Sequence, residues 1–191
     1  MKDAAVTDFY DSLETRSAEA RAEAIAKALP EQIARAKGLP GYADSLAGVD
    51  PAAITSSEAL AGLPVLRKSE LGKAQAASGP LGGFAGPAHG FAHIFQSPGP
   101  IYEPGGVSHD WWRMGRFLHA AGIGKEDIVQ NCFGYHLTPA GMIFENGARA
   151  VGAAVVPAGT GQTELQVRAA HDIGTTAYSG TPDHFQVCAG I

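Results

Sequence analysis

Hydrophobic and polar residues follow helical spacing in the first part of this 191-residue chain. Between residues 9 and 29, apolar side chains recur every three or four positions among Glu, Arg and Lys; they are Phe9, Leu13, Ala20, Ala24, Ala28 and Leu29. Pro30 is expected to break this helix, which resumes over residues 32–37. Capping signals within 50–58 and apolar residues within 67–76 predict two further short helices. Residues 1–78 are therefore predicted to form a helical segment.

From Phe91 onward the pattern changes to short β-prone runs separated by helical periodicity. The β-prone runs are 91–96, 127–133, 153–157 and 176–179. The helices expected between and after them are 111–121, 139–150, one that begins at Thr163 with a capping box to Gln166, and one that begins at Thr181-Pro182. This alternation predicts βαβ units around a parallel sheet, and thus an α/β fold class.

Two features of the pattern bear on domain organisation. Residues 79–90 are so rich in Gly and Pro that they are expected to be a linker loop. The last expected helix stops within a few residues, although a parallel sheet needs both faces covered and its edges protected. Residues 91–191 are therefore expected to be an incomplete α/β subdomain, truncated at its C-terminus.

Composition narrows the function classes. The chain is 45% hydrophobic and 17% charged, with a net charge of −5 and scattered Lys and Arg, so nucleic acid is not an expected partner. No apolar run approaches the roughly 20 residues that span a bilayer, and the N-terminus has no apolar signal core, so we expect no membrane segment and a cytoplasmic location. The two cysteines and seven histidines show no disulfide framework and no metal-ligand spacing, so no metal site is expected.

The turn within residues 94–104 stands where many α/β enzymes bind a phosphate, between a strand and an expected helix. Its chemistry does not suit that role, because the segment contains three prolines, one glycine and no lysine. The nearest cation in the following sequence, Arg113, lies one helical turn into the next expected element.

A second group of candidates follows the 127–133 strand, at the edge of a parallel sheet where ligands bind. Phe133, Tyr135, His136 and the nearby Thr138 would form the wall of an apolar pocket with a polar end; the alternative is a core strand end followed by a capped helix. His136 has no carboxylate or cysteine at a defined spacing, which is more typical of a structural histidine than of a catalytic one. The glycines of the 159–161 turn either permit close approach to a ligand or serve turn geometry alone.

Taken in order, several of these segments resemble the N-terminal part of phenylacetate-CoA ligases, which are AMP-dependent acyl-CoA synthetases of the adenylate-forming superfamily. The segments that carry the likeness are Asp-Phe-Tyr-Asp at 8–11, Leu-Pro-Val-Leu-Arg-Lys-Ser-Glu-Leu at 63–71, Phe-Gln-Ser-Pro-Gly at 95–99, Phe-Gly-Tyr at 133–135, Gly-Ala-Arg-Ala-Val-Gly at 147–152, Val-Val-Pro-Ala-Gly-Thr-Gly-Gln-Thr-Glu-Leu-Gln at 155–166, and Gly-Thr-Pro at 180–182. The Gly-Gln-Thr-Glu turn in its strand context is the most specific of these.

The resemblance implies a reaction in two steps. ATP activates an aryl or related carboxylic acid to an acyl-adenylate, with Mg²⁺ on the phosphates, and the thiol of CoA then attacks the adenylate. It further implies that Phe133, Tyr135 and His136 form the aromatic wall of the acyl pocket, bordered by Gly159 and Gly161.

The same resemblance assigns the 96–104 turn to the family's phosphate loop, which is rich in Ser, Thr and Gly and ends in Lys. Only Ser97, Gly99 and the final Pro are retained here, and Glu103 stands where the cation would be, so this loop is expected to be degenerate and to repel phosphate. The family's nucleotide-binding motifs and catalytic lysine would lie beyond residue 191.

These departures lead to a main hypothesis and its alternatives. The main hypothesis is an N-terminal fragment of a phenylacetate-CoA-ligase-like protein, inactive alone and without catalytic residues of its own. The alternatives are a non-catalytic module that binds an aryl acid or acyl-CoA, and an interaction subunit that needs a C-terminal partner chain or forms a homo-oligomer.

Overall fold

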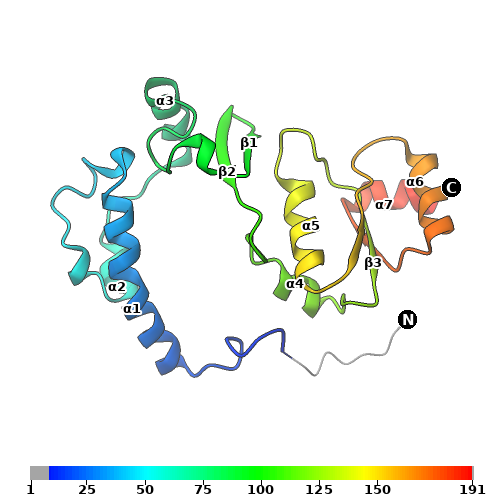
Figure 1. Ribbon diagram of the computed structural model, residues 1–191, viewed down its shortest axis with the longest axis horizontal. Helices are drawn as coiled ribbons and strands as arrows, with labels where there is room; N and C mark the ends of the chain where they lie inside the picture. Colours follow the sequence, from blue (N-terminus) through cyan, green and yellow to red (C-terminus); the bar gives the residue numbers. More distant parts are fainter. Residues whose placement is uncertain (1–8, 191) are drawn as a thin grey trace. The chain divides into compact units, whose positions relative to one another are not determined.

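The computed structural model of the protein describes residues 9–190, so Asp8 and Ile191 lie outside the described residues. The chain divides into two compact units (Figure 1). We call residues 11–104 the helical unit, and residues 105–190 together with Phe9 and Tyr10 the sheet unit. The predicted linker, residues 79–90, lies within the helical unit. The predicted division into a helical segment (1–78), a linker (79–90) and an α/β subdomain (91–191) remains a prediction.

The helical unit is built of short helices and one hairpin. Its elements are α1 (Ala18–Lys37), the single 3₁₀ turns η1 (Pro40–Tyr42) and η2 (Pro51–Ala53), α2 (Ser57–Ala61), α3 (Lys68–Ser78), a third 3₁₀ turn η3 (Ala88–Gly90), and the strands β1 (His93–Ser97) and β2 (Ile101–Gly105). Asp50 caps η2 by accepting a backbone N–H, as the capping signals predict. The helix expected from residue 9 begins only at Ala18, where Ser17 accepts a backbone N–H as its cap.

The expected break at Pro30 is wrong, because α1 runs through it as one helix of 20 residues. A proline removes one backbone hydrogen bond, whereas the Ala, Glu and Lys residues around it favour helix at every position. Beyond the proline, Ile33 is buried and α1 packs on η2, which anchors the second half of the helix.

The strand expected at 91–96 is present as β1, but the turn within 94–104 does not lead to a helix as expected. β1 and β2 form a two-stranded antiparallel sheet, so the Ser97–Ile101 turn is a hairpin turn. The next helix, α4 (Gly115–Ala120), begins only after Asp110 and Arg113, which have φ angles of 47° and 58°. Such left-handed residues do not fit a right-handed helix, so the helical pattern of residues 111–121 is realised only in its second half.

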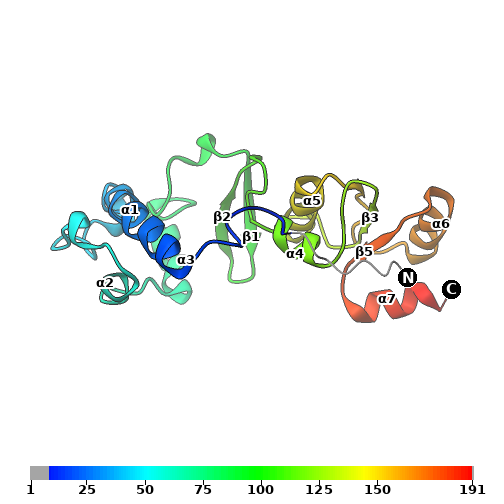
Figure 2. The same cartoon turned by 90° about the horizontal axis from the view of Figure 1, so that it is seen from below.

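The sheet unit confirms the α/β fold class. Strands β3 (Ile128–Asn131), β4 (Ala154–Val156) and β5 (Ala177–Ser179) form a parallel sheet in the order β4-β3-β5. The crossovers are α5 (Ala140–Ala150) and α6 (Thr163–Ile173), and α7 (Pro182–Ala189) follows β5. α5 covers one face of the strands, and α6 and α7 lie on the other (Figures 1 and 2).

A small apolar core holds α4 and α5 on the sheet. Its buried members are Leu118, Val129, Ala148 and Ala153. A Cβ atom added to Gly147 would lie 2.6 Å from Cβ of Met114, so α4 and α5 meet closely at this glycine. This packing fixes the direction of β3, and hence the position of the residues that follow its carboxyl end. Within residues 9–190, no helix has both the length and the apolarity to cross a membrane.

Candidate functional site

The predicted site residues fall into two groups, one in each unit. Phe133, Tyr135, His136, Gly159 and Gly161 follow β3 and β4 at the carboxyl edge of the sheet. Ser97 and Gly99 belong to the hairpin of the helical unit. Each group is described within its own unit.

Tyr135 is the best-anchored member of the first group. Asn131 is fully buried at the end of β3, and its Nδ2 donates to the Tyr135 hydroxyl oxygen at 2.8 Å and to the Gly141 carbonyl oxygen at 2.8 Å. A Cβ atom added to Gly141 would lie 2.8 Å from the Tyr135 ring, which shows that the ring packs directly on the start of α5. Burial and the charge of Glu145 raise the pKa of Tyr135 well above its usual value, so its hydroxyl is neutral near pH 7.

The 159–161 turn approaches Tyr135 from the neighbouring strand. The Gly159 amide donates to the Asn131 carbonyl oxygen at 3.0 Å, and a Cβ atom on Gly159 would lie 3.9 Å from Cδ2 of Tyr135. Gly159 and Gly161 have φ angles of 68° and 81°, a region that glycine adopts without strain. The structure therefore brings together Tyr135 and Gly159, while Gly161 lies at the exposed end of the same turn.

Gln166 holds this turn in shape. It is buried in α6, and its Nε2 donates to the carbonyl oxygens of Ala158, Gly159 and Gly161 at 3.4, 3.0 and 2.6 Å. The capping box expected between Thr163 and Gln166 is wrong, because α6 begins after a left-handed Gln162 and has no side-chain cap. The role of Gln166 is therefore to donate hydrogen bonds from its side-chain amide to the carbonyl oxygens of the glycine turn, rather than to cap α6.

Phe133 and His136 have different surroundings. Phe133 stacks on Phe144 of α5, with ring centroids 4.4 Å apart and planes at 19°. Phe144 meets Phe117 of α4 edge-on at 6.4 Å, so Phe133 is one end of an aromatic row. His136 is exposed beside the left-handed Leu137. Phe133 thus packs on the Phe144 side chain of α5, and Tyr135 packs on the α5 backbone at Gly141. The exposed His136 side chain takes part in neither contact.

A separate cavity of about 350 Å³ lies on the α6 and α7 side of the sheet. Its lining includes Gln130, Tyr178 and Phe185. Gln130 and Asn131 are successive residues of β3, and their side chains point to opposite faces of the sheet. The cavity is therefore distinct from the Tyr135 group, and none of the sequence-predicted site residues lines it.

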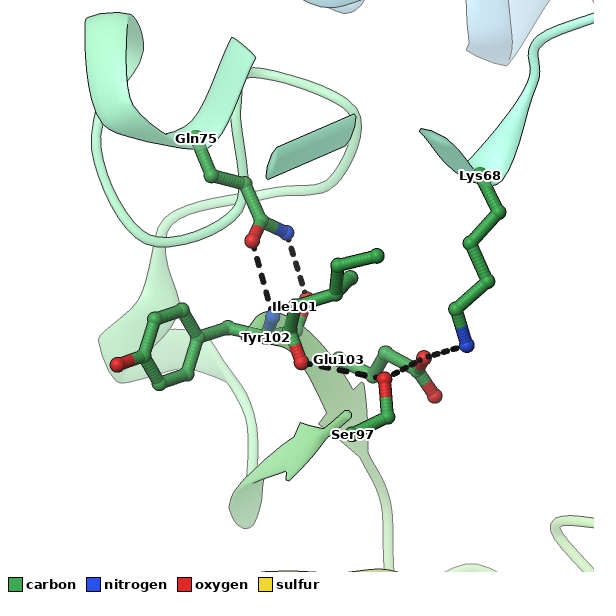
Figure 3. A network of polar contacts seen from close by, with 6 residues as sticks. All are labelled: Lys68, Gln75, Ser97, Ile101, Tyr102 and Glu103. Atoms are coloured by element: carbon green, nitrogen blue, oxygen red, sulfur yellow. Dashed lines mark hydrogen bonds and ion pairs between the residues drawn. The ribbon is translucent and has the colours of Figure 1, made fainter. Parts of the chain in front are cut away.

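In the helical unit, the hairpin is tied to α3 by a polar network (Figure 3). Lys68 Nζ lies 2.9 Å from Glu103 Oε1, and the Ser97 hydroxyl donates to the same oxygen at 2.8 Å. Gln75 donates from Nε2 to the Tyr102 carbonyl oxygen at 2.7 Å and accepts from the Tyr102 amide at 2.9 Å. Lys68, rather than Arg113, is therefore the cation at this turn, and Glu103 is paired rather than a bare negative charge.

Three residues of these two sites were not predicted in the roles that the structure gives them: Asn131, Gln166 and Lys68. Asn131 and Gln166 carried a weak signal, since each is an uncharged polar residue within an otherwise apolar or helical pattern next to a glycine turn. Lys68 carried none, because its partner is 35 residues away.

The ion pair of the hairpin predicts a pH-dependent stability. The hydrogen bond from Lys68 lowers the pKa of Glu103 below its ordinary value of 4.5. Stability from the pair is therefore complete above the unfolded-state pKa and is lost as the pH falls through the lowered folded-state pKa. Because both side chains are more than a third exposed, we expect Glu103→Gln to cost less than about 1 kcal/mol near pH 7.

Urea unfolding followed by far-ultraviolet circular dichroism, at neutral pH and below the lowered pKa, measures this effect. The difference in free energy of unfolding between the unchanged chain and Glu103→Gln should disappear below the lowered pKa of Glu103. A difference of the same size at both pH values would show that Gln disturbs packing rather than an ion pair.

Comparison with known proteins gives the relatives of this chain. No protein-family model matches the sequence. Phenylacetate-coenzyme A ligase of Thermus thermophilus is 32% identical over 150 residues, which are 75% of this chain and 33% of that protein. The enzymes of the same name from Aromatoleum evansii and Pseudomonas putida are each 31% identical over 144 residues. The chain is a homologue of phenylacetate-coenzyme A ligases. It spans about a third of the length of these relatives.

Solved structures agree on the fold. A crystal structure of 2-hydroxyisobutyryl-CoA ligase in the postadenylation state, in complex with 2-HIB-AMP, matches 91% of this chain with a TM-score of 0.81 and 24% identity. The same ligase in an open conformation, in complex with 2-HIB-AMP and CoA, also matches with a TM-score of 0.81. The match covers 39–40% of the ligase chain in these structures. The two units of this homologue therefore have the fold of part of an acyl-CoA ligase.

Proposed function

We propose that this phenylacetate-CoA ligase homologue is the part of an acyl-CoA ligase that carries a wall of the acid-binding pocket, and that it does not catalyse by itself. The full reaction would convert an aryl or related carboxylic acid to an acyl-adenylate and then to a CoA thioester. The observation that carries the proposal is the identity to phenylacetate-coenzyme A ligases over three quarters of the chain. The proposal is supported by the way Asn131 holds Tyr135 next to Gly159 at the carboxyl edge of the sheet.

The pocket wall we propose consists of Phe133, Tyr135 and Gly159. The Tyr135 ring is fixed by Asn131 and Gly141, and Gly159 offers no side chain, so a flat apolar body can approach the ring. His136 and Gly161 border this wall at its exposed side. The Tyr135 hydroxyl, neutral near pH 7 and hydrogen-bonded to Asn131, gives the wall a polar point next to its aromatic surface.

ATP, Mg²⁺ and CoA are the cofactors that the family implies, and the hairpin residues do not fit a triphosphate. Pro98 and Pro100 have no N–H to donate, and the Ser97 hydroxyl and the Lys68 ammonium are engaged by Glu103. Residues 9–190 contain no group of three or more His, Cys, Asp or Glu side chains that could hold a metal ion.

The test is ATP–pyrophosphate exchange with phenylacetate and the purified 191-residue chain. We expect exchange no faster than in a reaction without protein. Robust exchange that depends on phenylacetate would refute the claim that this part does not catalyse alone.

A second candidate function is a non-catalytic module that binds an aryl acid or acyl-CoA. It is favoured by one observation: among residues 9–190, the hydrogen bonds that anchor Tyr135 and Gly159 come from residues of the sheet unit. Calorimetric titration with phenylacetate and with phenylacetyl-CoA tests it, and the absence of heat with both ligands would discard it.

A third candidate, a subunit that assembles with a separate C-terminal chain or with a second copy, is favoured by the sheet. In the described residues β4 and β5 each pair on one side only, so both edges carry free backbone groups. Size-exclusion chromatography with light scattering tests it, and a stable monomer that binds no such chain would discard it.

A further inference from the structure

The hairpin network places two hydrogen-bond donors on a single oxygen. Lys68 Nζ and the Ser97 hydroxyl both lie within 2.9 Å of Glu103 Oε1 (Figure 3). An ammonium and a hydroxyl that converge on one anionic oxygen are the donors that a phosphate oxygen also takes. What occupies their meeting point here is a carboxylate of the same chain.

One helix, α3, carries Lys68 and is held against the hairpin that carries Ser97. Lys68 and Gln75 are seven residues apart in α3, so they lie on the same side of the helix, two turns from each other. Gln75 pairs with both backbone groups of Tyr102, as a neighbouring strand would, and this pairing fixes β2 against α3. Glu103 follows Tyr102 directly, so the clamp at Gln75 also fixes the distance between Lys68 and the hairpin.

We propose that Lys68 and Ser97 form an anion site that the Glu103 carboxylate of the chain itself fills, so that the hairpin excludes phosphate until this carboxylate is removed. The inference rests on the family resemblance, which assigns the 96–104 turn to the phosphate loop, and on the proposed function of this chain as part of a ligase. The side chains of Lys68 and Glu103 are 60% and 39% exposed, so an anion from solution reaches the site without unfolding. With Glu103 in place the ion pair has no net charge. Without the charge of Glu103, Lys68 contributes +1 next to the Ser97 hydroxyl, which also contacts the Ile101 carbonyl oxygen at 3.4 Å.

Titration with inorganic pyrophosphate at low ionic strength tests the proposal, because salt screens exposed charges. We expect Glu103→Gln to bind pyrophosphate about tenfold more tightly than the unchanged chain, because the competing negative charge is removed and a neutral amide oxygen holds the two donors less strongly than a carboxylate oxygen does. Glu70→Gln is the matched control: it changes the net charge by the same amount at an exposed side chain of α3, the helix that carries Lys68, and should alter affinity less than about twofold. Circular dichroism of each variant confirms that it is folded.

The double variant Lys68→Met with Glu103→Gln decides whether Lys68 is the cation. It should return the affinity to that of the unchanged chain. The proposal is overturned if Glu103→Gln binds no more tightly than the unchanged chain, if Glu70→Gln gives the same gain, or if the gain persists in the double variant. Phenylacetate takes no part in this experiment, so its result is independent of whether the sheet unit binds an acid.

Discussion

Asn131→Ala should lower the free energy of unfolding of the sheet unit by about 2–4 kcal/mol, the largest effect we expect from a single side chain. Asn131 is fully buried, and its amide nitrogen serves both the Tyr135 hydroxyl and the Gly141 carbonyl oxygen. Its removal leaves a cavity, and it leaves the half-buried Tyr135 hydroxyl and the buried Gly141 carbonyl oxygen without this donor. Because these groups join β3 to the start of α5, the Tyr135 ring should lose its fixed position together with the stability.

Urea unfolding followed by tryptophan fluorescence measures this loss, since both tryptophans, Trp111 and Trp112, lie in the sheet unit. Asn146→Ala is the matched control, because Asn146 makes one exposed bond, from Nδ2 to the Ser108 carbonyl oxygen at 3.2 Å. That variant should lose less than about 1 kcal/mol. Equal losses in the two variants would show that the Asn131 bonds do not anchor the site.

Gln166→Leu should lower the same free energy of unfolding by about 2–3 kcal/mol. The change keeps most of the side-chain volume but removes the donor that three carbonyl oxygens of the 158–161 turn share. The turn should therefore loosen even where the protein remains folded, and the amide hydrogens of residues 159–161 should exchange faster.

Hydrogen exchange measured by mass spectrometry reports this local effect, and urea unfolding reports the global one. Gln186→Ala, an exposed position in α7, is the control and should change stability by less than about 0.5 kcal/mol. Unchanged exchange at residues 159–161 in Gln166→Leu would mean that the turn keeps its shape through glycine geometry alone.

Features with a local cause could be predicted from the sequence. The α/β class and the strands β3, β4 and β5 follow from hydrophobic runs and their spacing, and the start of α7 follows from Thr181-Pro182. The break at Pro30 was predicted wrongly because a proline acts on one hydrogen bond, while the whole helix is held by packing. The first strand of the hairpin at residues 93–105 was predicted, but its second strand was taken for part of a turn, because it contains Glu103 and Pro104 and shows no β-prone pattern.

The candidate site divides in the same way. Tyr135 and Gly159 could be brought together from sequence, because the carboxyl ends of neighbouring parallel strands meet at one edge. The supports of these residues could not, since Gln166 acts through its side chain on the preceding turn rather than as a cap. The pairing of Lys68 with Glu103 depends on how α3 lies against the hairpin, and no local pattern encodes that.

The most direct test of the central claim, that the sheet unit carries a wall of an acid-binding pocket, is an NMR titration of the ¹⁵N-labelled chain with phenylacetate. We predict saturable shifts of the amide signals of Gly134, Tyr135 and Gly159, and no comparable shifts around the 350 Å³ cavity near Tyr178 and Phe185. The absence of shifts at Tyr135 and Gly159, or shifts confined to the cavity, would contradict the account.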